Sequence, residues 1–274
     1  MSNIILELKD ICYSYHNLNG ETPALSHISF QVKQGEFLAI VGPSGCGKST
    51  LLSIIFGLLA PENGELIFSV NSGEMQAARH QTAGISPQIG YMLQHDHLFE
   101  WRTIYQNVIL GLEINKQLTP EKIDRVLELL RDYDLYKFKD KKPSELSGGM
   151  KQRAALIRTL VLDPELLLLD EPFSALDYQT RLSVSSDICN IIRSTGKTAI
   201  LITHDLSEAI SLADRILVMS KRPATIKCDI PIHLTLSDHS PLASRNAPEF
   251  REYFNQLWKE ISDETYTQDA KNTK

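Results

Sequence analysis

Residues 42–50, with the sequence GPSGCGKST, have the residue types and spacing of a phosphate-binding loop. Glycine lets the backbone wrap closely enough for its N–H groups to point at phosphate oxygens, and the N-terminus of a following helix adds partial positive charge. Lys48 is placed to reach the β- and γ-phosphates, and the Ser49 hydroxyl to bind Mg²⁺. The segment therefore predicts a site for ATP with Mg²⁺, made by Gly42, Pro43, Ser44, Gly45, Cys46, Gly47, Lys48, Ser49 and Thr50.

A pair of acids, Asp170 and Glu171, follows the apolar run 166–169 directly. A buried strand that ends in two carboxylates is costly unless those groups have partners or chemistry to perform. Beside a phosphate-binding loop, the first acid typically holds Mg²⁺ and the second polarises the attacking water. We therefore expect Asp170 to be a metal ligand and Glu171 to be catalytic.

The four cysteines lie far apart and include no C-x-x-C pair, which argues against a zinc site or a disulfide framework and fits a reducing compartment. Cys46 lies inside the phosphate-binding loop, and two interpretations stay open. Either a small side chain is tolerated there, or the helix N-terminus lowers the pKa of the thiol and makes it reactive. We assign Cys46 no catalytic role.

The elements that must position these groups follow from hydrophobic periodicity. A buried strand over 38–41 precedes the loop, and a helix over 49–56, ended by Gly57, follows it. Further buried parallel strands are expected over 166–169, 199–203 and 216–219. Residues 4–40 predict short antiparallel strands with turns at 19–20 and 34–35. A helix is expected from Pro120, with Thr119 as its N-cap.

Near the C-terminus, residues 231–248 are expected to be irregular. Apolar residues between 250 and 261 then predict an amphipathic helix, for which packing onto the main domain is favoured over a separate partner site. The polar residues 263–274 are expected to be disordered. No stretch of residues reaches the length of about 20 apolar residues that a membrane-spanning helix needs.

Residues 146–153, LSGGMKQR, form a second glycine-rich helix start and resemble the signature motif of ABC ATPases. The resemblance, which covers about residues 4–222, implies a homodimer packed head to tail. In such a dimer, Ser147, Gly148 and Gly149 of one subunit close over ATP held by the other subunit.

Other family landmarks occur in the expected order. Gln94 resembles the glutamine that senses Mg²⁺ and water, and it is counted here as both catalytic and metal-binding. Asp177 ends a segment that resembles the loop touching the opposite subunit, and His204 resembles the histidine that contacts the γ-phosphate. Tyr15 resembles the aromatic residue that stacks on adenine, although Tyr13 lies on the same strand face.

A narrower resemblance links residues 98–103 (LFEWRT), residues 221–224 (KRPA) and the C-terminal aromatic helix to importers of nitrate, sulfonates and taurine. That group has Leu and Pro where this chain has Phe99 and Glu100, and residues 69–88 look longer than usual. An importer of thiamine precursors is the alternative. A soluble ABC ATPase acting on ribosomes or DNA, and a binding module without turnover, are the alternatives of other classes.

The resemblance and the residue pattern together imply an α/β fold: a P-loop NTPase core with an antiparallel β subdomain and an inserted α-helical subdomain at about 95–160. The ATPase domain is expected over 1–230 and a C-terminal extension over 231–274. The net charge of −6 gives no support for nucleic acid as a partner. The implied partners are transmembrane permease subunits and, indirectly, an extracytoplasmic solute-binding protein. These place the chain at the cytoplasmic face of the membrane.

Overall fold

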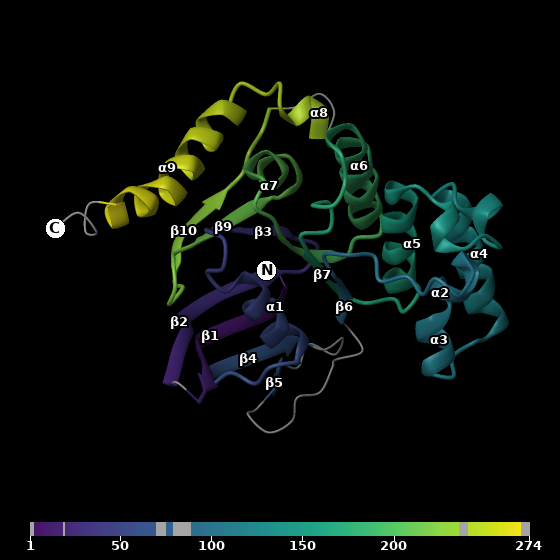
Figure 1. Cartoon of the computed structure of the whole chain (residues 1–274), viewed down its shortest axis with the longest axis horizontal. Coiled ribbons are helices and arrows are strands. Elements are labelled where there is room, and N and C mark those ends of the chain that lie inside the picture. The colour runs from purple at the N-terminus through teal and green to yellow at the C-terminus, as the bar shows by residue number, and fades with distance from the viewer. Residues whose placement is uncertain (1–2, 19, 70–74, 79–88, 236–240, 270–274) are drawn as a thin grey trace. The chain divides into compact units, whose positions relative to one another are not determined.

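The computed structural model covers the 274-residue chain and describes every residue except 1–2, 19, 70–74, 79–88, 236–240 and 270–274 (Figure 1). The chain forms two compact units. The first comprises residues 1–86 and 198–274, and the second comprises residues 87–197. The second unit therefore contains the expected helical segment together with strands and a helix beyond it, and the C-terminal extension belongs to the first unit.

The first unit contains an antiparallel sheet in the order β2-β1-β4-β5. Its strands are β1 (Ile4–Asn17), β2 (Gly20–Lys33), β4 (Asn63–Ser69) and β5 (Met75–Ala78). The expectation of short strands before residue 34 is wrong, because β1 and β2 are 14 residues each. Register shifts between Leu8 and Tyr13 interrupt the alternation of buried and exposed side chains, so one long strand looks like two in the sequence.

The same unit holds parallel strands that confirm three of the expected segments. Strand β3 (Phe37–Val41) pairs in parallel with β8 (Thr198–Ile202) and with β9 (Arg215–Met219), and β10 (Ile226–Pro231) runs antiparallel to β9. Every residue of β3 and β8 is buried, as expected for central strands. Helix α1 (Lys48–Phe56) follows β3 and ends at Gly57, whose φ of 87° is left-handed.

Three helices complete this unit: α7 (Leu206–Leu212), α8 (Pro241–Ser244) and α9 (Phe250–Asp269). Leu257 of α9 is fully buried, and the ammonium of Lys227 on β10 donates to the carbonyl of Glu260 at 2.6 Å. The amphipathic helix is therefore confirmed as packed on its own unit. The expectation of disorder from residue 263 is wrong as far as Asp269, because the helix continues through those positions.

The second unit begins with β6 (Ile89–Met92), which pairs in parallel with β7 (Leu166–Asp170). Its helices are α2 (Ile104–Val108), α3 (Leu110–Ile114), α4 (Pro120–Asp132), α5 (Gly148–Leu160) and α6 (Tyr178–Ser194). Short 3₁₀ turns lie at Tyr136–Phe138 and Pro143–Glu145. Thr119 caps α4 by accepting from the backbone N–H of Lys122, which confirms the expected helix start.

A core of apolar side chains from α2, α3, α4 and α5 holds the helical part of the second unit together. It includes Ile104, Val108, Leu112, Val126 and Leu130, all of them fully buried. Together the two units show the expected α/β class, with an antiparallel sheet, parallel strands and a helical part. Among the described residues, no helix is both long enough and apolar enough to cross a membrane.

Candidate nucleotide-binding site

The phosphate-binding loop connects the end of β3 to the start of α1, as the sequence predicts. Gly47 caps α1 with a φ of 125°, and Gly45 has a φ of 71°, two conformations that L side chains rarely adopt. At Gly42 the constraint is space, because a Cβ there would lie 2.8 Å from the carbonyl oxygen of Met219. The glycines therefore let the loop curve and let β9 approach it closely.

Lys48 is buried and lies against its own loop. Its ammonium donates to the carbonyl oxygens of Gly42 at 2.8 Å and Pro43 at 2.9 Å. These carbonyls hold the positive charge at the loop, where phosphate oxygens would bind. Lys48 is the first residue of α1, and its positive charge is opposite to that of nucleotide phosphates.

Tyr15 on β1 lies beside α1. Its hydroxyl and the Thr50 hydroxyl are 2.8 Å apart, and the tyrosine is 39% exposed. Tyr13 packs edge-on against it, with ring centroids 5.1 Å apart and an interplanar angle of 86°. Tyr15 therefore presents part of its ring to solvent next to the phosphate-binding loop, which is the arrangement that stacking on a base requires.

Cys46 is buried in the loop, with its sulfur 3.8 Å from the ammonium of Lys48. Burial raises the pKa of the Cys46 thiol, and the nearby Lys48 offsets this only in part. The interpretation of Cys46 as a thiol with a lowered pKa is therefore wrong. The local positive charge is there, but the loss of hydration of the thiolate outweighs it.

His204 follows β8 in the first unit, as expected, and its side chain is exposed. The turn that carries it is built by its neighbours. Thr203 donates to a carboxylate oxygen of Glu208 at 2.5 Å, and Asp205 caps α7 by accepting from the N–H groups of Ser207 and Glu208. These bonds orient the backbone on both sides of His204.

The acidic pair lies at the end of β7 in the second unit. Asp170 is buried and accepts a hydrogen bond of 3.2 Å from the Tyr91 hydroxyl. Glu171 has a φ of 46°, a left-handed conformation that is uncommon for a residue with a Cβ. Strained backbone of this kind tends to occur at functional sites, where the surrounding structure holds it in place.

The structure brings Gln94 and Glu171 together within this unit. The Gln94 amide nitrogen lies 3.4 Å from a carboxylate oxygen of Glu171 and 3.4 Å from the Ser174 hydroxyl. The Ser174 hydroxyl in turn donates to the Glu171 carbonyl at 2.9 Å. Two of the residues predicted to handle water and metal are therefore neighbours, although they are far apart in the sequence.

The signature segment opens α5 through Ser147, whose hydroxyl accepts from the Met150 N–H at 3.4 Å. Gly149 is buried, and a Cβ there would lie 2.8 Å from Val184 of α6. Asp177 caps α6 by accepting from the Thr180 N–H at 3.1 Å. The pKa of its carboxyl is lowered, first by hydrogen bonding with the Thr180 side chain and then by this backbone bond. The close packing of α5 against α6 therefore requires glycine at position 149, in addition to the anion-binding role expected for Gly149.

Two contacts at the site lie outside the sequence prediction. The Tyr91 hydroxyl bonds Asp170, and the Arg222 guanidinium donates from Nε to the carbonyl oxygen of Gly45 at 2.9 Å. Arg222 belongs to the segment 221–224 that was singled out from the sequence, whereas Tyr91 was not singled out. No local pattern, however, could show that the turn after β9 reaches the tip of the phosphate-binding loop.

The donor set fits ATP and Mg²⁺. Ser49 in the first unit offers a hydroxyl, and Asp170 and Gln94 in the second unit offer a carboxylate and an amide; each supplies an oxygen of the kind that Mg²⁺ prefers alongside phosphate and water. In the part of the chain that the structure describes, no group of three or more His, Cys, Asp and Glu side chains could hold a metal ion alone.

Comparison with known proteins agrees with this geometry. Residues 25–174 match the family model described as ABC transporter. The chain is 43% identical over 257 residues to the ABC transporter ATP-binding protein YtlC of Bacillus subtilis (strain 168), covering 94% of this chain and 95% of that protein. It is 38% identical to a taurine import ATP-binding protein of Roseobacter denitrificans, covering 92% and 94%. It is 36% identical to a nitrate import ATP-binding protein of Synechocystis, covering 92% and 93%.

Solved structures of ATP-binding cassettes have the same fold as this chain. A dimeric ATP-binding cassette in a post-hydrolysis state, bound to ADP and Pi, superposes with a TM-score of 0.68 at 28% sequence identity, covering 84% of this chain and 99% of that one. The P-loop NTPase fold is thereby confirmed, together with ATP as the nucleotide. The chain belongs to the ABC transporter family and is one of its ATP-hydrolysing subunits.

Proposed function

We propose that this chain powers the import of a small solute of the nitrate, sulfonate or taurine kind. The observation that carries the proposal is the similarity, over more than nine-tenths of the chain, to proteins named for taurine and nitrate import. The departures at Phe99 and Glu100 lie in the segment expected to meet the membrane partner. The ATPase function does not depend on them.

In the proposed reaction, adenine stacks on Tyr15 and the phosphates bind the backbone N–H groups of residues 42–50. Lys48 would bind the β- and γ-phosphates, and Ser49, Asp170 and Gln94 would hold Mg²⁺, which would supply charge neutralisation when bound. Glu171, oriented by its contact with Gln94, accepts the proton of the attacking water. His204 contacts the γ-phosphate.

We further propose that two copies act head to tail. Ser147, Gly148 and Gly149 of one copy would close over the γ-phosphate bound by the other, with Asp177 near the contact between subunits. The start of α5 supports this, because Ser147 and Gly148 are exposed there and the N-terminus of a helix suits an anion. Closing and reopening of the pair would be driven by ATP binding and hydrolysis.

The partner that uses this motion is proposed to be a transmembrane permease that receives solute from an extracytoplasmic binding protein. The chain would then work at the cytoplasmic face of the membrane. Residues 94–101 are the proposed contact, and Trp101 within them is 72% exposed. An aromatic side chain of this size at the surface is typical of residues that anchor a protein interface.

The test is an affinity pull-down of Glu171→Gln loaded with ATP from detergent-solubilised membranes of the native cell, with partners identified by mass spectrometry. The expected result is a multi-span membrane protein recovered with ATP and lost with the matched variant Lys48→Ala. Recovery of ribosomes or DNA-repair proteins without a membrane protein would contradict the proposal. Uptake of taurine, sulfonate and nitrate is then measured in vesicles that hold the identified membrane partner together with the chain carrying its native Glu171, and the solute taken up is the one transported.

A further inference from the structure

Arg158 makes a contact that the proposed reaction leaves unexplained. It lies near the end of α5, and its guanidinium donates to the carbonyl oxygens of Asp96 at 2.7 Å and His97 at 2.8 Å. Burial lowers the pKa of Arg158, with the nearby Asp96 acting in the opposite direction. A guanidinium taken out of water is costly unless its donors are bonded, so the two carbonyls are a specific receptor for it.

The backbone at these carbonyls has the shape that the arginine needs. His97 has a φ of 44°, and the N–H of Leu98 donates to the Asp96 carboxylate at 3.0 Å. The chain therefore turns tightly at residues 96–98, which leaves two successive carbonyls for one guanidinium. Two parallel bonds fix orientation as well as distance.

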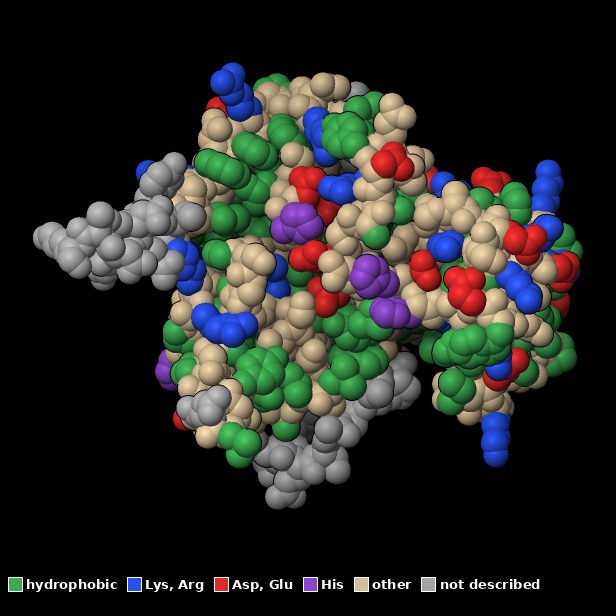
Figure 2. Space-filling view, viewed as in Figure 1, with side chains coloured by type: hydrophobic (Ala, Val, Ile, Leu, Met, Phe, Trp, Pro, Cys, Tyr) green, Lys and Arg blue, Asp and Glu red, His purple; other side chains and the backbone are tan. Residues whose placement is uncertain are grey.

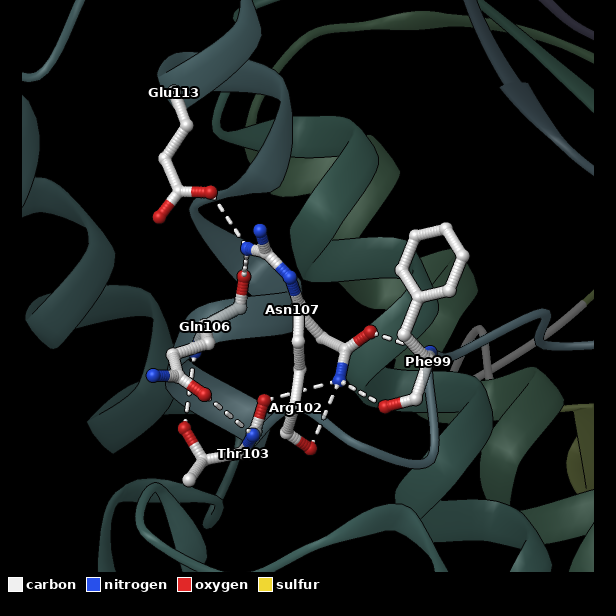
Figure 3. Close-up of polar contacts among 6 residues, drawn as sticks. All are labelled: Phe99, Arg102, Thr103, Gln106, Asn107 and Glu113. Carbon is white, nitrogen blue, oxygen red and sulfur yellow. Dashed lines mark hydrogen bonds and ion pairs between the residues drawn. The ribbon is translucent and has the colours of Figure 1, made fainter.

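The other end of the same segment is held by Asn107 (Figure 3). This side chain is fully buried, accepts from the Phe99 N–H at 2.7 Å, and donates to the carbonyls of Phe99 at 3.1 Å and Thr103 at 3.0 Å. Arg102 adds an ion pair of 2.6 Å with Glu113. Residues 96–103, the braced segment, are thus held at both ends by side chains of the same unit.

The braced segment carries an aromatic pair, of which Trp101 is exposed and Phe99 is partly buried. The rings of Phe99 and Trp101 have centroids 4.7 Å apart. Figure 2 shows hydrophobic side chains at the surface over α2 and α3, the region into which the braced segment leads. Because the backbone beneath Trp101 is fixed from both sides, a movement of its anchors must move the ring as well.

One of those anchors is part of the helix that the signature segment opens. Arg158 and Ser147 lie at opposite ends of α5, which spans about 15–20 Å at 1.5 Å per residue. Gln94, which contacts Glu171, lies two residues before the carbonyl that Arg158 binds. A displacement of α5 would therefore pull on the chain between the hydrolytic residues and Trp101.

We propose that Arg158 is a positioning residue that links the signature helix α5 to the braced segment, so that nucleotide-driven movement of α5 moves Trp101. The inference rests on the proposed closure of two subunits over ATP. Arg158 touches neither nucleotide nor water in this scheme. Its effect is transmitted through the carbonyls of Asp96 and His97.

The full chain supplies its own reporter, because it contains two tryptophans and Trp258→Phe leaves Trp101 as the single one. In a Glu171→Gln, Trp258→Phe background, acrylamide quenching of Trp101 is measured with and without MgATP. Dimer formation is followed in parallel by size-exclusion chromatography. We expect MgATP to shift the quenching constant in this parent, Arg158→Met to lose that shift while still dimerising, and Arg158→Lys to keep part of it.

Arg125→Met is the matched control, since Arg125 is an exposed arginine of α4 whose ion pair with Glu128 lies at the surface. An equal shift in Arg158→Met and Arg125→Met, or a parent that dimerises with no Trp101 shift, would overturn the inference while leaving the proposed function intact. A parent that fails to dimerise with MgATP would contradict the proposed function, and this inference with it. Should Arg158→Met fail to fold, a full shift in Arg158→Lys would overturn the link and a partial one would support it.

Discussion

Glu171 combines a left-handed backbone with a carboxylate held by Gln94, and the two features have a common consequence. The unusual φ turns the chain sharply after β7, so that the second acid leaves the line of the strand while Asp170 stays buried at its end. Adjacent carboxylates thus occupy different environments. Such a separation is what lets one acid bind a cation while its neighbour handles a proton.

For Glu171→Gln we expect ATP binding to persist and kcat to fall about 10²- to 10⁴-fold, because the amide cannot accept the proton of the attacking water. Steady-state phosphate release and equilibrium nucleotide binding measure the two quantities. Glu128→Gln is the control, since Glu128 is exposed on α4 and forms only a surface ion pair. An unchanged kcat in Glu171→Gln would remove Glu171 from the reaction.

The burial of Cys46 predicts how the rate of its alkylation depends on pH. The pKa of an ordinary cysteine thiol is about 8.5. Because burial raises the pKa of the Cys46 thiol, its thiolate becomes populated only at a higher pH than in an ordinary cysteine. Alkylation of Cys46 in the native chain should therefore be slow at neutral pH and accelerate as the pH rises past that value. Peptide mass spectrometry of samples labelled across a pH series, with urea-unfolded chain as reference, measures the rate. Rapid labelling at pH 7 would contradict the burial argument.

At the scale of elements, close approach between neighbouring elements explains two glycines of the second unit. Gly149 lets α5 lie against α6, and Gly90 of β6 lies where a Cβ would meet Thr159 of α5 at 2.4 Å. Helix α5 is thus packed on two sides through positions without a side chain. A displacement of the signature end of α5 would therefore also displace β6 and α6, because tightly packed elements move together.

The C-terminal helix α9 yields a stability prediction. Leu257 is fully buried, so Leu257→Ala should lower the free energy of unfolding by about 2–5 kcal/mol through lost burial and a cavity. The neighbouring Trp258 is 60% exposed, and Trp258→Ala should change stability by only about 0.5 kcal/mol. Urea unfolding followed by circular dichroism compares the two variants. Equal, small effects would show that α9 contributes little to the stability of its unit.

At the scale of the whole molecule, the proposed site is complete only when two copies meet. Ser147→Arg should leave ATP affinity unchanged, because the phosphate-binding loop is untouched, and should abolish ATP-dependent dimers of Glu171→Gln through a bulky charge at the contact. Size-exclusion chromatography and nucleotide binding measure both properties. Ser144→Arg, at an exposed position three residues earlier, is the control. Normal dimerisation of Ser147→Arg would refute the composite site, once a thermal melt has shown that loss of the helix cap left the chain folded.

The sequence by itself determined the chemistry of this protein. Residues 42–50, the acids at 170–171 and the signature at 147–149 are local patterns, and each depends on a strand or helix that its own residues specify. The strands at 38–41, 166–169, 199–203 and 216–219, the helix at 49–56 and the helix that starts at Pro120 were predictable for the same reason. The spacing of apolar side chains reflects which face of an element is buried.

Only the tertiary structure decided which distant residues meet. The pairing of Gln94 with Glu171, of Arg222 with Gly45 and of Arg158 with residues 96–97 joins segments between 61 and 177 positions apart. The pKa of Cys46 could not be decided from the sequence for the same reason, because the helix N-terminus is visible in the sequence whereas burial of the thiol is not. Periodicity records that a side chain is buried, but the identity of its neighbours is set by how the elements pack.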